Sequence, residues 1–159
     1  MNFYEQENNK TVLKTREIIR ELPEFCNEFF LDLNQNTLPK TRMGYAYDLR
    51  VFFNFLVTEN KEFLGRDIKS LTLDDLQKIK VVDINQFMDY LAYYVSDEDS
   101  QLYSNGENGK ARKLAAVRKL FKYFYRTEKI SSNPAELTIT PKRHEKEIVR
   151  LEPNEVAEM

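Results

Sequence analysis

The feature that most restricts the fold of this chain is an amphipathic helical pattern in residues 110–126. Apolar residues recur there at spacings of three and one, which matches one face of a helix with 3.6 residues per turn. These positions are Leu114, Val117, Leu120, Phe121, Phe124 and Tyr125. Basic residues fall mainly off that stripe: Lys110, Arg112, Lys113, Arg118, Lys119, Lys122 and Arg126. Such a helix packs one side against a core and presents cations on the other, which suits the phosphates of nucleic acid.

The charge of the chain is unevenly distributed. The formal net charge is -2, which by itself argues against a nucleic-acid protein. Residues 108–150, however, hold twelve Lys or Arg and four Asp or Glu, a balance of +8, whereas residues 59–107 hold five and eleven, a balance of -6. This polarity creates a field that draws a polyanion to one side. Charge alone leaves two interpretations open, a nucleic-acid surface and a solvated helix face.

The composition is that of a helical globular protein. With four Gly and five Pro in 159 residues, and 42% hydrophobic residues, the chain favours one all-α domain with a substantial core. The single cysteine, Cys26, excludes an internal disulfide and is expected to be buried. No long apolar run and no signal-peptide pattern is present, so we expect a soluble cytoplasmic protein without a membrane partner.

The first half of the chain predicts three helices. Residues 1–12 are polar and are expected to form a loosely ordered tail, followed by a helix over residues 13–33. A second helix is predicted from Leu38 and Pro39 to about Thr58, with Thr37 as its cap. Residues 60–71 are expected to connect it to a short helix capped by Thr72, with Asp75 at the capping-box position.

The second half predicts two further helices and an extended linker. Residues 83–95 have helical spacing, and the acidic residues 96–109 are expected to form an exposed, mobile loop before the basic helix, which continues to about Glu128. Pro134 is expected to open one further short turn. Residues 13–139 are therefore predicted to be one helical domain. Residues 140–159 then form a linker and the opening of another helix.

No catalytic, metal or cofactor site is predicted. The only histidine, His144, lies in the linker, so no His/Cys cluster is present to bind zinc. The sequence contains no glycine-rich phosphate loop and no nucleophile beside a recognisable base. We therefore expect a non-catalytic chain with no cofactor and no small-molecule substrate.

Two motifs together resemble a known family. Residues 41–56 follow the pattern T-x-x-x-Y-x-x-D-L-x-x-F-x-x-F-L, and residues 111–126 read ARKLAAVRKLFKYFYR, followed by Asn133-Pro134 and Pro141-Lys142. In this order they resemble the amino-terminal, SAM-like core-binding domain of tyrosine recombinases, the Xer-type and phage or transposon integrase family. The resemblance covers roughly residues 13–159. The segment of residues 83–109 is longer than the corresponding segment of compact family members. The family's catalytic domain would begin near Leu151.

The resemblance implies a four- to five-helix bundle that binds the core site of double-stranded DNA for a site-specific recombinase. The parent enzyme would break and rejoin DNA through a phosphotyrosine bond. Its catalytic domain is absent from this sequence, and none of the tyrosines here is assigned as the nucleophile. The family assembles on paired DNA sites, and its first helix often meets neighbouring protomers. Residues 13–33 are therefore a candidate contact with other recombinase protomers.

The starts of the second and the basic helix are the expected DNA-binding sites, because a helix start offers unpaired N–H groups to phosphate. Arg42, Lys110 and Arg112 are expected closest to bases. The full set of candidates is Lys40, Thr41, Arg42, Asn108, Lys110, Arg112, Lys113, Lys119, Lys122, Lys142 and Arg143. Asp48 is expected to pair inside the protein, since phosphate repels a carboxylate. Thr41 has an alternative interpretation as a cap, and Arg118 as a structural ion-pair partner.

Two other functions remain open at this stage. One is a helical DNA-binding transcription regulator with no enzymatic parent. The other is a helical protein-interaction module whose basic face meets an acidic protein. Salt-dependent binding to duplex DNA separates the second from the recombinase interpretation.

Overall fold

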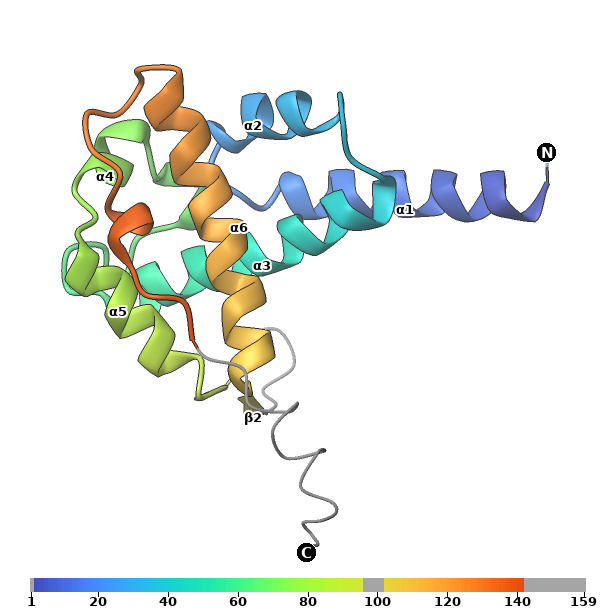
Figure 1. Cartoon of the computed structure of the whole chain (residues 1–159). Coiled ribbons are helices and arrows are strands. Elements are labelled where there is room, and N and C mark those ends of the chain that lie inside the picture. Colours follow the sequence, from blue (N-terminus) through green and yellow to red (C-terminus); the bar gives the residue numbers. More distant parts are fainter. Residues whose placement is uncertain (1, 96–101, 142–159) are drawn as a thin grey trace, which may run out of the picture.

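Six α-helices account for most of residues 2–95 and 102–141, the part of the chain that the computed structural model describes (Figure 1). They are α1 (Phe3–Ile19), α2 (Cys26–Leu33), α3 (Pro39–Glu59), α4 (Leu73–Gln77), α5 (Val81–Tyr90) and α6 (Glu107–Arg126). The other regular elements are two 3-10 turns, η1 (Ile68–Ser70) and η2 (Pro134–Leu137), and an antiparallel pair of short strands, β1 (Tyr93–Val95) and β2 (Leu102–Ser104). The predicted all-α bundle is confirmed.

The beginning of the chain differs from the prediction. Residues 3–12, expected as a loose tail, belong to α1, because Asn2 and Glu5 form a capping box that starts the helix at Phe3. The single helix predicted over residues 13–33 is two helices, separated near Pro23. Proline disfavours helical geometry at the residue before it and cannot donate to the preceding turn, so the helical pattern is interrupted there.

The segment predicted as a helix over residues 83–95 is also divided. Helix α5 ends at Tyr90, and Tyr93–Val95 forms a strand that pairs antiparallel with Leu102–Ser104. Aromatic and β-branched residues fit a strand once a partner is available, and the chain supplies that partner only after the intervening loop. Residues 96–101, the centre of the loop predicted to be mobile, lie outside the described part of the chain; Glu107 to Gly109 belong to α6.

Helices α3 and α4 confirm their predictions. Helix α3 begins with Pro39 at its first position, although its N-cap is Leu38 and not Thr37, whose hydroxyl donates instead to the Leu33 carbonyl at the end of α2. Thr72 caps α4 in the predicted capping box with Asp75. The Arg66 guanidinium donates to both oxygens of that carboxylate, at 3.1 and 2.9 Å, and ties the preceding connector to α4.

Phenylalanine rings join the helices at the centre of the bundle. The Phe52 ring of α3 lies 5.1 Å from Phe87 of α5 and 6.5 Å from Phe121 of α6, measured between ring centroids, in edge-to-face geometry. All three side chains are fully buried. Figure 1 shows the resulting arrangement: α6 crosses α3, and the amino-terminal half of α1 projects away from the body of the domain. The crossing determines which faces of α3 and α6 stay open to solvent.

Candidate nucleic-acid interface

An exposed basic stripe runs along α6. Its members recur at spacings of four, three, four and three residues, which places them on one face of the helix. They are Asn108, Arg112, Ala115, Lys119 and Lys122, and all five are exposed. With a rise of 1.5 Å per residue, the stripe is about 21 Å long. Within the described residues, the ammonium groups of Lys119 and Lys122 have no ion pair or hydrogen bond, so both are free to meet an external anion.

The start of α3 adds a second group of exposed polar residues. Lys40 and Thr41 lie in its first turn and are exposed. No side chain caps the first N–H groups of α3 or α6, whereas α1 and α4 begin with capping boxes. The helix starts predicted to meet phosphate therefore keep unpaired backbone donors, together with the positive end of the helix dipole.

A buried carboxylate connects the two helices. Asp48 of α3 is buried, and its Oδ1 accepts a hydrogen bond from Arg112 Nη2 at 3.1 Å. The expected internal pairing of Asp48 is confirmed. Burial raises the pKa of this carboxyl above its ordinary value, against the opposing effect of Arg112 and Lys113. The Arg112 side chain is 66% exposed, so it covers the carboxylate and still presents the remaining guanidinium donors to solvent.

Besides Arg112, three of the candidate cations have partners inside the protein. The Lys113 ammonium is buried and donates to Asn105 Oδ1 at 3.0 Å; burial lowers its pKa. Lys110 is half-buried and forms an ion pair with Glu107 at 3.8 Å. Arg42 donates to the backbone carbonyl and the hydroxyl of Thr37. These residues are not brought into the stripe, although they contribute to the positive field around it.

Arg118 of α6 fixes the segment around η2 by hydrogen bonds. Its guanidinium donates to the Ala135 and Thr138 carbonyls and to the Thr140 hydroxyl. The alternative interpretation of Arg118 as a structural residue is therefore supported, with carbonyls in place of a carboxylate as partners. Lys142 and Arg143, the candidates in the linker, lie outside the described residues.

Gly44 was not singled out from the sequence. It lies in α3 one turn after Lys40 and one turn before Asp48, so these three positions share a face. A Cβ atom built at Gly44 would meet nothing within 4 Å. A glycine inside a long predicted helix can be recognised from the sequence alone, because alanine is favoured at such positions.

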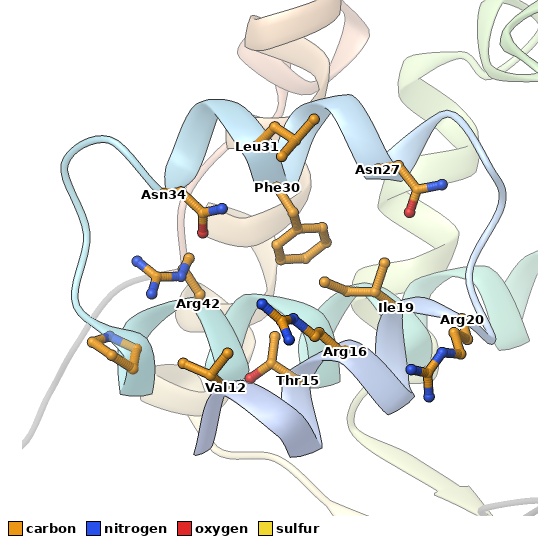
Figure 2. A pocket seen from close by; sticks show the side chains of 11 residues that line it. Val12, Thr15, Arg16, Ile19, Arg20, Asn27, Phe30, Leu31, Asn34 and Arg42 are labelled. Atoms are coloured by element: carbon orange, nitrogen blue, oxygen red, sulfur yellow. The ribbon is translucent and has the colours of Figure 1, made fainter. Parts of the chain in front are cut away.

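A groove lies on another side of the bundle, between α1, α2 and the start of α3 (Figure 2). Its cavity volume is about 430 Å³. Figure 2 shows the Phe30 ring pointing into it from α2, with the guanidinium groups of Arg16, Arg20 and Arg42 around it. The groove therefore combines an apolar interior with a positive rim, and Arg42 belongs to this face of α3.

The described residues contain no group of three His, Cys, Asp or Glu side chains arranged to hold a metal ion. In the same part of the chain, no helix combines the length and the apolar character needed to cross a membrane.

Curated proteins similar to this chain are tyrosine recombinases. The tyrosine recombinase XerC of Caldanaerobacter subterraneus subsp. tengcongensis is 34% identical over 128 residues, covering 76% of this chain and 33% of the relative. XerC of Chlorobaculum parvum is 34% identical over 116 residues, covering 73% and 30%. XerC of Pelobacter propionicus is 29% identical over 116 residues, covering 73% and 32%. The chain thus spans about a third of the length of these relatives. No family model and no solved structure matches it.

Proposed function

Because this chain belongs with the Xer-like tyrosine recombinases and corresponds to their amino-terminal region, we propose that it binds duplex DNA as part of a site-specific recombinase. The observation that carries this proposal is the exposed stripe on α6, joined to the middle of α3 through the contact between Arg112 and Asp48. Two helix starts and a row of cations on neighbouring surfaces fit a duplex, whose phosphates attract cations and backbone N–H groups alike.

The exposed side chains divide into two roles. Arg112 and Asn108 lie at the start of α6 and reach base edges in the major groove, where Arg pairs with guanine and Asn with adenine. Lys119 and Lys122 lie farther along the helix and contact phosphates, as do Lys40 and Thr41 on α3. Arg42, Lys110 and Lys113, which have partners inside the protein, act on the structure and the field of the domain. Lys142 and Arg143 track the backbone of the duplex beyond the described residues.

The whole protein, in this proposal, is a tyrosine recombinase, which is the name that the XerC relatives carry, and it breaks and rejoins DNA. Within this proposal, the phosphotyrosine chemistry is assigned to the catalytic domain that the family resemblance implies. Duplex DNA and further protomers on paired sites are the proposed partners. The domain described here contributes DNA binding and site recognition to that reaction.

Fluorescence anisotropy with a labelled duplex, over a series of salt concentrations, tests DNA binding by this chain. We expect weak, micromolar binding that falls with salt, in the range of contacts made largely to phosphates. Lys122→Ala is expected to weaken all duplexes alike and to lower the salt slope by about one. Lys69→Ala, which removes the same charge from an exposed residue of η1 outside the stripe, is the matched control and should change neither quantity.

Two outcomes contradict the proposal. Binding that does not depend on salt, or no binding to any duplex, would favour the module that meets an acidic protein. Equal effects of Lys122→Ala and Lys69→Ala would show that the charge of the chain, and not the stripe, attracts DNA.

The groove between α1, α2 and α3 is, within the same proposal, a contact between protomers. The projecting end of α1 carries Phe3 and Tyr4, which are 76% and 65% exposed, beside the carboxylate of Glu5. Its apolar rings and negative charge complement the apolar interior and arginine rim of the groove. Each copy therefore carries both halves of a head-to-tail contact, which closes into a ring when the geometry permits.

Sedimentation velocity of the chain on a duplex with two binding sites tests this contact. Phe3→Ser and Leu31→Ser each change one half, and Leu31 is an exposed residue that lines the groove. Both variants are expected to reduce association between bound copies without lowering the affinity of a single copy for one site. Leu64→Ser, at an exposed leucine away from both halves, serves as the control. Unchanged association in both variants would exclude the groove as the contact.

A further inference from the structure

Gly44 occupies a position in α3 where glycine has a cost and no internal purpose. In the interior of a helix, glycine is less favourable than alanine because it loses more backbone freedom on folding. Some glycines are needed because a neighbouring element lies too close for a Cβ atom. At Gly44 that reason is absent, since a Cβ atom would meet nothing within 4 Å, and its φ angle is not in the left-handed region. The packing of the described residues therefore does not explain this glycine.

The surroundings of Gly44 are those of a surface that meets phosphate. Lys40 lies one turn before it, and Thr41 lies beside it on the same side of the helix; both are exposed. Asp48, one turn after it, holds the guanidinium of Arg112 at 3.1 Å. Cations thus lie on both sides of Gly44: Lys40 of α3 on one side, and Arg112 of α6, held by Asp48, on the other. The space over Gly44 is therefore open, with positive charge on either side along the surface.

We propose that Gly44 is the point where the sugar-phosphate backbone of a bound DNA strand approaches α3 most closely. The missing side chain lets the strand lie against the helix backbone, while Lys40 and Thr41 on one side contact the adjacent phosphates and Arg112 on the other side extends toward the bases. Ammonium, hydroxyl and backbone N–H groups all donate to phosphate oxygens, and such contacts position a duplex without reading its sequence. This inference rests on the proposed binding of duplex DNA and adds a steric requirement to it.

A substitution series separates this role from a structural one. Gly44→Ala is expected to raise the melting temperature by roughly 2–4 °C, because alanine favours the helix and the site has room for it. The same variant is expected to bind duplex DNA about threefold to tenfold more weakly, and Gly44→Leu at least about tenfold more weakly, since each added methyl group pushes the strand away. A structural glycine would show the opposite pattern, with stability and affinity falling together.

The controls make the result specific. Asn85→Leu introduces the same side chain at an exposed position of α5 and should leave affinity unchanged. Two duplexes of unrelated sequence should be weakened equally by Gly44→Leu, because the proposed contact is with the backbone. An effect on only one duplex would overturn the backbone assignment. Wild-type affinity in Gly44→Ala and Gly44→Leu, or an equal loss in Asn85→Leu, would overturn the inference. Failure of the wild-type chain to bind any duplex would instead reject the proposed function.

Discussion

Variants of Asp48 and Arg112 distinguish two roles of this pair, stabilising the domain and contacting DNA. The carboxylate is buried, whereas the guanidinium that donates to it is two-thirds exposed. Arg112→Ala, Asp48→Asn and the double variant form a thermodynamic cycle around this contact. Asparagine keeps the shape of the side chain and an oxygen that can accept from Arg112, but it removes the buried charge.

The expected magnitudes follow from burial. Arg112→Ala leaves a buried carboxylate without its hydrogen bond, which costs about 1–3 kcal/mol in general. Because the guanidinium side of the contact is open to solvent, water replaces part of the lost interaction, and we expect about 1–2 kcal/mol. Asp48→Asn removes the unfavourable burial of a charge together with one charged hydrogen bond, so its net effect on stability should lie within about 1 kcal/mol of zero. In the double variant most of the cost of Arg112→Ala should disappear.

Urea unfolding followed by far-UV circular dichroism at neutral pH measures these values, with an unchanged slope as the sign that the unfolded states are comparable. DNA binding by the same proteins provides the second readout. Arg112→Ala is expected to lose about 1–3 kcal/mol of affinity and some sequence preference. Asp48→Asn should retain affinity, because it leaves the guanidinium in place.

Either of two results would refute this reasoning. If Arg112→Ala is as stable as the wild type, Asp48 does not depend on it. If Asp48→Asn loses DNA affinity as severely as Arg112→Ala, the arginine acts only through its internal partner, and its assignment as a DNA contact is withdrawn.

Four further predictions concern stability and chemistry. Phe52→Ala removes the ring shared by α3, α5 and α6 and should cost about 3–5 kcal/mol in urea unfolding; a loss below 1 kcal/mol would contradict the packing. The hydrogen bond from Arg66 lowers the pKa of Asp75. The contribution of Asp75 to stability is therefore complete above the ordinary carboxyl pKa and is lost as the pH falls through the lowered value. In Asp75→Asn, the free energy of unfolding should depend less on pH in that range. The pKa of Asp48 is raised, so its contribution to stability falls as pH rises from the ordinary value through the raised one, and Asp48→Asn should remove that component. Burial raises the pKa of the Cys26 thiol, which should therefore react with a thiol reagent only after unfolding; rapid reaction in the native state would contradict its burial.

The sequence by itself determined the features that depend on near neighbours along the chain. Helical spacing identified most of the buried face of α6, because residues three and four apart lie on one side of a helix whatever surrounds it. Tyr125, the last residue of that pattern, is 48% exposed and was predicted wrongly. The capping box of Thr72 and Asp75 was predictable for the same reason, since all of its atoms lie within one turn. The motifs of α3 and α6 also carried the family resemblance, which the XerC relatives support.

Boundaries failed where two local signals competed or where a distant partner decided. Helix α1 begins ten residues earlier than predicted, at Phe3, because a capping box outweighs the polar composition of the segment. Strand β1 required the partner segment Leu102–Ser104, so its helical spacing was misleading. A short apolar run can satisfy either structure, and only pairing with another part of the chain decides between them.

Tertiary structure alone decided which cations are available to a ligand. Lys113 and Lys119 lie on the same helix with the same chemistry, yet one is buried against Asn105 and the other is exposed. The partner of Arg112, Asp48, lies 64 residues away in the sequence. Arg42 lines the groove and donates to the Thr37 carbonyl, in the segment that precedes α3. Charge and helical period describe what each residue offers. Burial and pairing arise from contacts between elements far apart in sequence, so the surface that DNA would meet could not be derived from local pattern.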